Sequence, residues 1–392
     1  MRRRTPLTVA LVLALAGAAP GPAGAARSVT LAPPAGIAEF FGVNVNRLFN
    51  DAGPAVDIER QLSAVRTAGI TVARTDAMWA FTDPWGPAAP GSPGFPAQAD
   101  RRARMLAEHG LRWQPILDYT PTWAQSREGD MHSSPRDPRQ FADFAERFAA
   151  RYGPGGAFWA ANRGLPYLPV EVYEIWNEEN NAKFWSPAPA PGAYADLYLL
   201  ARAAIHHVQP DAIVTIGGLA NDGGDFLRSM YAARPSLAGQ VDAVAIHPYA
   251  TTADGVLASV DRFHEALRAV QPDDVPLYVT ELGWYTSAGP HQPLLRSDAS
   301  RAAVLARALR GLLARRVSDN LRAVEPYTWW TPQRDPDSGE DWYGLCRTDG
   351  TLSPAGTVLA SFAREDAVAA ARAGTSRTYM IGRGRRVLDD YR

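Results

Sequence analysis

Lysine and cysteine are almost absent from this sequence, and each absence removes a class of function. Lys183 is the only lysine, so every other one of the 40 basic residues is arginine. No lysine follows a GxxxxG run, which excludes a P-loop, and Lys183 stands in a polar stretch, unlike the sheltered lysine of a Schiff-base enzyme. Cys346 is the only cysteine, so the chain has no internal disulfide and no cysteine-rich zinc site.

An excess of charge of either sign is also lacking. Forty basic residues stand against 41 acidic ones, which gives a net charge of −1 over 392 residues. A nucleic-acid partner is therefore not expected. No GxGxxG motif follows the first β-branched run, which argues against a dinucleotide-binding fold. What the chain does have is 46% apolar residues, enough to bury a large core.

The N-terminus has the pattern of a secretory signal peptide. Three arginines at positions 2–4 precede an apolar run over residues 7–19, and small residues at 23–25 fit a signal-peptidase site. The run is too short to span a bilayer comfortably, and no cysteine follows it to carry a lipid. We expect residues 1–25 to be removed and the remainder to be exported without a membrane anchor.

Eight short β-branched runs alternate with longer stretches of helical period. The runs are GVNVN (42–46), ITVARTD (70–76), RWQPILD (112–118), VEVYEIWNE (170–178), AIVTIGG (212–218), VDAVAIHPY (241–249), LYVTELGW (277–284) and AVEPYTWW (323–330). The main helix candidates cover residues 58–68, 139–151, 193–207, 259–270, 301–315 and 353–371.

Strands separated by helices require parallel pairing with right-handed crossovers. Eight β/α units of this length predict an α/β fold, a single-domain (β/α)8 TIM barrel over residues 26–372, followed by a polar C-terminal tail at 373–392. The Pro/Gly-rich segments 84–96 and 187–191 follow strands, and the loops after barrel strands form the face that carries active sites.

The predicted strand ends carry an unusual set of side chains. Strand two ends in Arg74, strand four in Asn177 and Glu178, and strand seven in Glu281. Strands four and seven lie on opposite sides of a barrel, so these two glutamates would face each other across its mouth. Two facing carboxylates are what glycoside hydrolysis requires. The bland alternative, two unrelated strand-end carboxylates, is weakened by their joint occurrence.

The residues around both glutamates resemble a known group of enzymes. EIWNEEN (174–180) and VTELGW (279–284) resemble the acid/base and nucleophile motifs of clan A retaining glycoside hydrolases. The spacing of Asn177, Trp185 and Tyr194, followed by QPDAIVTIGG, is most similar to family 39, with family 5 as a relative. The resemblance extends from about residue 42 to residue 362 and implies a (β/α)8 barrel.

The resemblance also implies roles, position by position. Glu178 matches the general acid/base and Glu281 the nucleophile, while Asn177 matches the residue that binds the sugar 2-hydroxyl. In the same way Arg74 and Tyr249 match groups that hold the nucleophile, His247 a substrate-side hydrogen-bonding position, and Trp329 the tryptophan under the reacting sugar. No histidine follows DYTPTW after the third strand, which departs from some relatives.

Several neighbouring residues leave alternatives open. We expect Glu174 and Glu179 to have surface or supporting roles, and Asp118 either to contact sugar or to cap a turn. His247 could instead be a packed structural histidine. Trp329 and Trp330 are consecutive, so only one of them can point into the barrel mouth, and the resemblance favours Trp329.

Tryptophan supplies a separate argument, because aromatic rings stack on the C–H faces of sugars. Eight of the 11 tryptophans fall at or just past a predicted strand end: Trp79, Trp85, Trp123, Trp185, Trp284, Trp329, Trp330 and Trp342. This distribution predicts a cleft with several sugar subsites, with Trp123 among the residues that bind substrate.

Opposite roles for the two glutamates require different surroundings. We expect Arg74 to hold Glu281 as a carboxylate, and Glu178 to keep its proton until the leaving oxygen takes it. The sequence thus predicts a secreted, monomeric, retaining β-glycoside hydrolase that needs no metal or cofactor and cleaves an extracellular oligo- or polysaccharide internally. The alternatives are an exo-acting enzyme such as a β-xylosidase, a non-catalytic carbohydrate-binding barrel, and a metal-dependent barrel hydrolase. The last is weakened because HxH is missing from the first strand.

Overall fold

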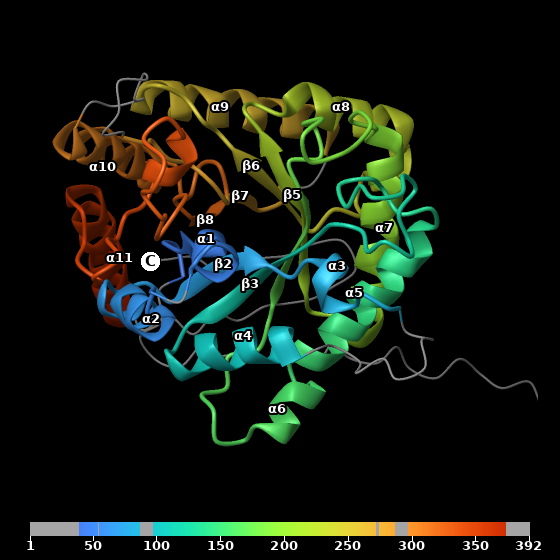
Figure 1. Cartoon of the computed structure of the whole chain (residues 1–392). Coiled ribbons are helices and arrows are strands. Elements are labelled where there is room, and N and C mark those ends of the chain that lie inside the picture. Colours follow the sequence, from blue (N-terminus) through green and yellow to red (C-terminus); the bar gives the residue numbers. More distant parts are fainter. Residues whose placement is uncertain (1–38, 54, 87–96, 272–273, 287–296, 374–392) are drawn as a thin grey trace, which may run out of the picture.

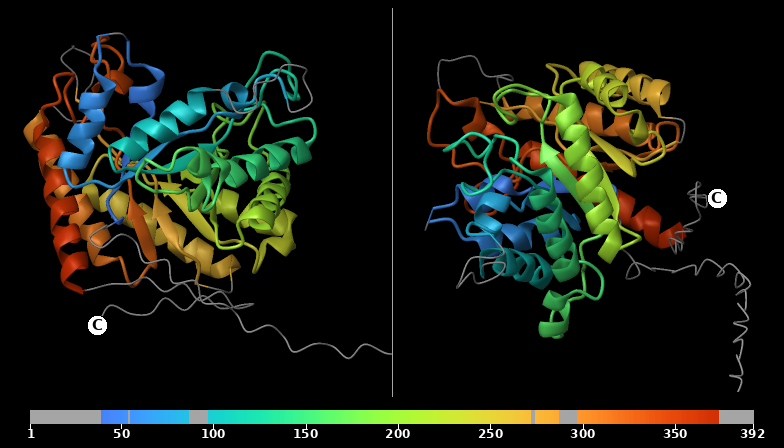
Figure 2. Two further views of the ribbon diagram at one scale, coloured as in Figure 1. Left: turned by 90° about the horizontal axis from the view of Figure 1, so that it is seen from below. Right: turned by 90° about the vertical axis from the view of Figure 1, so that its right-hand side faces the viewer.

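A computed structural model of the chain describes residues 39–53, 55–86, 97–271, 274–286 and 297–373. Within them, eight parallel strands form one sheet in the order β1 to β8, and helices surround this sheet (Figures 1 and 2). The predicted (β/α)8 architecture is confirmed. The expected signal peptide and the tail beyond residue 373 lie outside the described residues.

All eight predicted strands are present, with shifted ends. They are β1 (Val43–Asn44), β2 (Val72–Asp76), β3 (Arg112–Leu117), β4 (Val172–Asn177), β5 (Ile213–Ala220), β6 (Ala243–His247), β7 (Leu277–Val279) and β8 (Leu321–Val324). The last two are shorter at the carboxyl end than the sequence predicts. Beyond Val324 the chain meets Pro326, which cannot donate to a strand ladder, and Trp329 and Trp330 lie outside the sheet.

The six predicted helices are also present. Their bounds are α2 (Ile58–Thr67), α5 (Pro138–Tyr152), α7 (Pro191–Val208), α9 (Ala253–Val270), α10 (Asp298–Ala314) and α11 (Pro354–Ala373). The structure adds α1 (Asn46–Asn50), α3 (Trp79–Thr82), α4 (Ala97–Glu108), α6 (Ala157–Ala161) and α8 (Gly224–Ala233), with 3-10 turns η1 (Pro235–Leu237) and η2 (Gly339–Trp342). Among the described residues, no helix is long and apolar enough to cross a membrane.

Helix α5 shows how sequence pattern fixes the packing of a helix on the barrel. The Asp137 side chain accepts a hydrogen bond from the backbone N–H of Arg139, and Pro138 occupies the first turn, where its missing N–H costs nothing. Phe141, Phe144 and Phe148 then recur at helical spacing and are fully buried. The helix therefore buries one aromatic face between the sheet and its neighbours.

The barrel closes where β1 meets the end of β8. Gly42 N–H donates to the Val324 carbonyl at 3.1 Å and Asn44 N–H to the Pro326 carbonyl at 3.2 Å. The Asn44 side chain continues the closure, because its Nδ2 donates to the Thr280 carbonyl at 2.8 Å and to the Glu325 carbonyl at 2.9 Å. One buried amide thus joins β1 to the ends of β7 and β8.

Removal of this amide should destabilise the barrel. Asn44→Ala leaves two carbonyls without a donor, so we expect the free energy of unfolding to fall by about 2–4 kcal/mol, measured by urea denaturation. Gln240→Ala removes an exposed amide and is the control, with an expected change below about 0.5 kcal/mol. Equal effects of the two variants would contradict a role for Asn44 in closure.

Candidate active site

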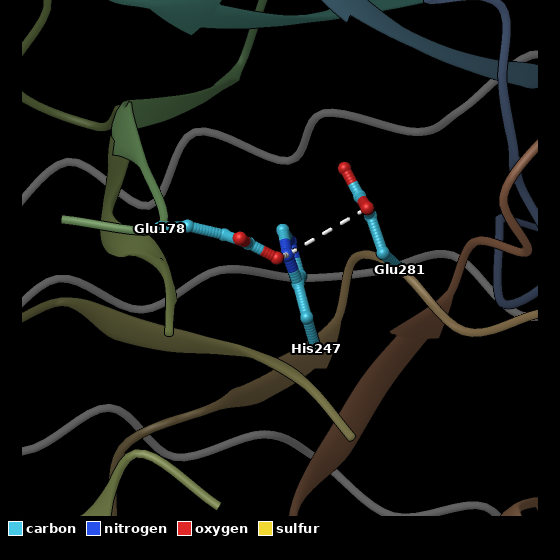
Figure 3. Close-up of side chains that lie close together, drawn as sticks. All are labelled: Glu178, His247 and Glu281. Atoms are coloured by element: carbon cyan, nitrogen blue, oxygen red, sulfur yellow. Dashed lines mark hydrogen bonds and ion pairs between the residues drawn. The ribbon is translucent and has the colours of Figure 1, made fainter. Parts of the chain in front are cut away.

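The two glutamates singled out in the sequence lie together at the carboxyl ends of their strands. Glu178 is the first residue after β4, and Glu281 follows β7 (Figure 3). One carboxylate oxygen of each lies within 4.8 Å of the other. Their side chains are 12% and 10% exposed, so both are largely screened from solvent while remaining reachable.

A local backbone conformation turns the end of β4 toward the mouth. Trp176 and Glu178 have positive φ values of 70° and 49°, which non-glycine residues rarely adopt. Regular alternation would place Glu174, Trp176 and Glu178 on one face of the strand. The positive φ at Trp176 breaks this alternation, so its ring packs against Trp185 while Asn177 lies beside Arg74. Strain of this kind is often found at functional sites.

Arg74 of β2 lies at the centre of the polar network beneath the glutamates. Its Nε and Nη2 donate to the two Glu174 oxygens at 2.7 and 2.8 Å, and its Nη1 donates to Glu281 Oε1 at 2.8 Å. Its Nη2 also donates to Asn177 Oδ1 at 3.1 Å. The guanidinium is fully buried and therefore fixes the position of the Glu281 carboxylate, as expected from the sequence.

Tyr249 holds the other oxygen of Glu281. Its hydroxyl donates to Glu281 Oε2 at 2.8 Å. Burial raises the pKa of Tyr249 well above its usual value, and the Glu281 charge adds to this, so the hydroxyl keeps its proton and stays a donor. Both oxygens of Glu281 are thus held, by the two side chains that the sequence indicated.

His247, at the end of β6, lies between the two glutamates and has no exposed surface. Its Nδ1 is 3.0 Å from Glu178 Oε1 and 3.7 Å from Glu281 Oε2. A Cβ on Gly218 would lie 1.9 Å from His247 Nε2, so only glycine leaves room for this ring. The ring contacts both carboxylates, and the expected hydrogen bond from His247 to substrate stays a prediction.

The hydrogen bonds around His247 determine where its protons lie. The Thr280 hydroxyl donates to Glu174 Oε1 at 3.2 Å, so its oxygen accepts a proton from His247 Nε2, 3.1 Å away. The hydrogens of Arg74 Nη2 are already directed at Glu174 and Asn177. Because Nε2 is protonated, a single proton lies between His247 Nδ1 and Glu178 Oε1.

Glu178 differs from the sequence-based expectation. Burial raises the pKa of its carboxyl, but the hydrogen bond and positive charge of His247, together with the Asn181 amide, outweigh burial and lower the pKa below its usual value. The direction of this shift is opposite to the one expected for a Glu178 that keeps its proton until the leaving oxygen takes it. The main cause of the lowered pKa is His247, which ends β6 and is therefore not part of the β4 motif.

Loss of the histidine charge should raise the pKa of Glu178. We expect the Glu178 carboxyl of His247→Gln to titrate at higher pH than that of the parent, because the carboxylate loses its cationic partner. Carbon-13 NMR of labelled glutamate side chains measures this, with Glu178→Gln to assign the resonance. His206→Gln, on α7, is the control and should leave the titration unchanged. A fall in the Glu178 pKa would contradict the pairing.

The tryptophans do not form the predicted cleft. Trp329 is fully buried, and its Nε1 donates to Gln61 Oε1 at 3.0 Å. Trp330 is buried as well and donates to Thr348. Trp79, Trp185 and Trp284 are also buried in the packing of the loops. The expectation that Trp329 underlies the reacting sugar is wrong, because this ring belongs to the core.

The other three tryptophans are more accessible. Trp85 is 58% exposed, whereas Trp123 and Trp342 are half-buried. Trp123 donates to the Asp83 carbonyl at 3.1 Å and packs edge-on against Trp79. Trp123 follows β3 and so belongs to the loops of the active face, but no contact joins it to the two glutamates in the described residues.

Sequence reasoning missed several buried polar residues. Glu174 is fully buried and accepts hydrogen bonds from Arg74, Thr280 and the Gly218 N–H. The regular alternation of β4 before Trp176 was a usable signal for Glu174. Glu179 and Asp118 are also fully buried. Burial raises the pKa of both carboxyls well above the usual range.

Tyr327 was missed as well, because it lies outside both glutamate motifs. Burial raises its pKa well above the usual value, with Glu340 and Glu281 adding to the effect. Its ring lies 5.3 Å from that of Tyr343, which in turn lies 6.3 Å from Tyr249. Tyr327, two residues before Trp329, thus belongs to a row of tyrosines that ends at Tyr249, the partner of Glu281.

Glu178, His247 and Glu281 also have the spacing of metal ligands, with one ligand atom of each within 4.8 Å. Both Glu281 oxygens already accept hydrogen bonds, from Arg74 and from Tyr249. Arg74 Nη1 lies 2.8 Å from Glu281 Oε1, so a divalent cation bound to Glu281 would be repelled by the Arg74 guanidinium. These residues therefore suit proton transfer and nucleophilic attack better than metal binding.

Comparison with known proteins agrees with this arrangement. Residues 175–359 match the family model of the glycosyl hydrolase catalytic core. A search of curated proteins found no matching sequence.

Solved structures share the fold. A family 39 glycoside hydrolase from Bacteroides cellulosilyticus WH2 superposes with a TM-score of 0.61 at 22% identity, over 84% of this chain and 63% of that one. A monomeric β-xylosidase from Caulobacter crescentus CB15 gives 0.61 at 19%, over 86% and 69%. The GH39 enzyme from Xanthomonas axonopodis pv. citri gives 0.63 at 18%, over 84% and 67%.

The chain thus spans about two thirds of the length of these structures, and at such identities the likeness is one of fold. The matched segment runs from β4 into α11 and includes Glu178, His247, Tyr249 and Glu281. Residues 175–359 of this (β/α)8 barrel thus match the glycosyl hydrolase catalytic core, and the matched segment carries both glutamates.

Proposed function

We propose that this enzyme is a retaining β-glycoside hydrolase that acts on an extracellular oligo- or polysaccharide. The observation that carries the proposal is the separation of the glutamates, whose nearest oxygens lie within 4.8 Å. Retaining enzymes hold their carboxyl groups about 5–5.5 Å apart, whereas inverting enzymes need about 6.5–9.5 Å to admit a water between them. No such gap separates Glu178 from Glu281.

In the first step a Glu281 oxygen attacks the anomeric carbon, while Glu178 gives its proton to the leaving oxygen. The glycosidic C–O bond breaks and an ester bond to Glu281 forms. In the second step Glu178 removes a proton from water, the water oxygen attacks the anomeric carbon, and Glu281 leaves as a carboxylate. Two inversions restore the original configuration.

His247 reconciles the lowered pKa of Glu178 with its role as an acid. One proton is shared between His247 Nδ1 and Glu178 Oε1, 3.0 Å apart, so the histidine can return it to the carboxylate when the leaving oxygen arrives. Once the leaving group has taken the proton, the low pKa favours the carboxylate that serves as base in the second step. The pair therefore serves both halves of the reaction.

Two further observations support the proposed export and the proposed substrate class. The signal-peptide pattern at residues 1–25 supports export, and the likeness to a β-xylosidase supports a β-linked substrate. Burial of five of the eight strand-end tryptophans removes the argument for a long cleft and favours the second candidate, an exo-acting β-glycosidase. A polysaccharide and its short oligomers, compared by reducing-end detection, distinguish the two modes.

A retaining mechanism fixes the anomer of the first product. Proton NMR of early hydrolysis of an aryl β-glycoside should show the β-anomer first, with the α-anomer arising later by mutarotation. Glu265→Gln, an exposed carboxylate on α9, is the control and should give the same course as the parent. An initial α-anomer would mean that the two carboxylates act by inversion.

Azide should reveal which glutamate has which role. Glu178→Ala should lose about 10²–10⁴-fold in rate on substrates with poor leaving groups and much less on activated aryl glycosides. Azide needs no base, so it should rescue the second step of this variant and yield a β-glycosyl azide.

Glu281→Ala should instead give an α-glycosyl azide, because azide then occupies the side of the missing nucleophile. The anomers are identified by proton NMR of the products. If both variants gave the same anomer, the two roles would be wrongly assigned.

A further inference from the structure

An asparagine holds the second oxygen of Glu178. His247 Nδ1 lies 3.0 Å from Glu178 Oε1, and the Asn181 side chain donates from Nδ2 to Glu178 Oε2 at 3.1 Å. Both oxygens of the acid/base therefore have a partner. Asn181 directly follows the EIWNEEN segment, and the sequence resemblance assigned it no role.

The orientation of the Asn181 amide follows from its other contact. Asn181 Oδ1 accepts a hydrogen bond from the Lys183 backbone N–H at 3.0 Å. An amide oxygen only accepts and an amide nitrogen only donates, so this contact turns Nδ2 toward Glu178. Asn181 is therefore a donor to Glu178 and cannot take a proton from it.

The turn that carries Asn181 is fixed to the end of β5. The Glu178 N–H donates to the Gly218 carbonyl at 3.1 Å, and the Asn181 N–H donates to the Glu178 carbonyl at 2.8 Å. The Asn180 side chain exchanges two hydrogen bonds with the backbone of Ala220, at 2.8 and 3.0 Å. These contacts preorganise the Asn181 amide beside Glu178.

The two oxygens of Glu178 therefore differ as sites for a proton. A carboxyl oxygen that carries the proton is a weaker acceptor than the other oxygen, so the hydrogen bond from Asn181 is strongest when the proton is on Oε1. Oε1 is also the oxygen beside His247, whose Nδ1 lies 3.7 Å from Glu281 Oε2. The favoured proton position is thus on the His247 side of Glu178, and the same histidine contacts the nucleophile (Figure 3).

We infer that Asn181 is a positioning residue for the acid/base: its hydrogen bond to Oε2 directs the reacting proton to Oε1 of Glu178. This inference rests on the proposed function. In the first step the Oε1–H bond breaks as the leaving oxygen takes the proton, and in the second step Oε1 takes a proton from water. Oε2 keeps its hydrogen bond to Asn181 in both steps, and Asn181 itself neither gains nor loses a proton.

Other groups that interact with Glu178 carry charge or titrate, whereas Asn181 does neither. They are His247 of β6, Arg74 of β2, Glu281 after β7, the adjacent Glu179, and the hydroxyls of Tyr119, Tyr249 and Tyr343. His247, Arg74 and the Asn181 amide favour the carboxylate, and the neighbouring glutamates oppose it. Replacement of Asn181 by alanine therefore removes one donor and leaves the charges of the site unchanged.

The pKa of the Glu178 carboxyl tests this contact directly. Asn181→Ala removes the donor and Asn181→Asp replaces it with an acceptor of similar shape, so both should raise the pKa, the second more than the first. Carbon-13 NMR of labelled glutamate side chains measures the shift. Asn221→Asp makes the same chemical change at an exposed residue after β5, and this matched control should leave the titration unchanged.

Kinetics separate a positioning role from a structural one. In Asn181→Ala, kcat/KM should fall by at least about tenfold for β-glycosides with poor leaving groups, whereas activated aryl β-glycosides should keep their value within about twofold, because their leaving group needs no acid. The basic limb of the pH profile of kcat/KM should move to higher pH, since the acid loses a donor that favours its ionised form. A structural role would lower both values together.

Three results would overturn the inference: an unchanged Glu178 pKa in Asn181→Ala, an equal loss of kcat/KM on both kinds of substrate, or a shift in Asn221→Asp as large as that in Asn181→Asp. A parent enzyme that hydrolyses no β-glycoside would contradict the proposed function instead. The NMR titration does not depend on turnover, so in that case it still decides whether Asn181 controls the proton of Glu178.

Discussion

The ion pairs of Arg74 with Glu174 and Glu281 are the interaction on which the active site depends. Two carboxylates and one guanidinium are almost fully withdrawn from water, and the guanidinium is the cation that both carboxylates contact. Loss of one partner from such a group costs about 3–5 kcal/mol, since it leaves a buried charge uncompensated. The position of the nucleophile is therefore inseparable from the stability of the barrel interior.

The same network joins strands that are far apart in the chain. Glu174 accepts hydrogen bonds from β2, from the Gly218 N–H of β5 and from Thr280 after β7, so one carboxylate aligns three strand ends. Asn44 adds β1 and the end of β8 through its amide. The polar groups that hold the catalytic pair thus also hold the carboxyl ends of the strands in register, and catalysis and closure share one set of contacts.

Proton placement follows from this geometry. The Thr280 hydroxyl is directed to Glu174, which assigns a proton to Nε2 of His247 and leaves Nδ1 to share one with Glu178. The lowered pKa of Glu178 therefore follows mainly from its contact with His247. The two glutamates differ in their partners, since Glu281 accepts hydrogen bonds from a guanidinium and a tyrosine hydroxyl, whereas Glu178 contacts an imidazole.

The sequence by itself determined the eight β/α units and the pair Glu178 and Glu281, because both are local patterns: periodicity for the strands, motifs for the glutamates. It also indicated Arg74 and Tyr249 as partners of the nucleophile. Only the tertiary structure decided that Trp329 is a core residue, that His247 contacts both glutamates, and that Tyr327, Tyr343 and Tyr249 pack in turn beside Glu281. The physical reason is that burial, ion pairing and the pKa of Glu178 arise from contacts between strands and loops distant in sequence, and no local pattern records them.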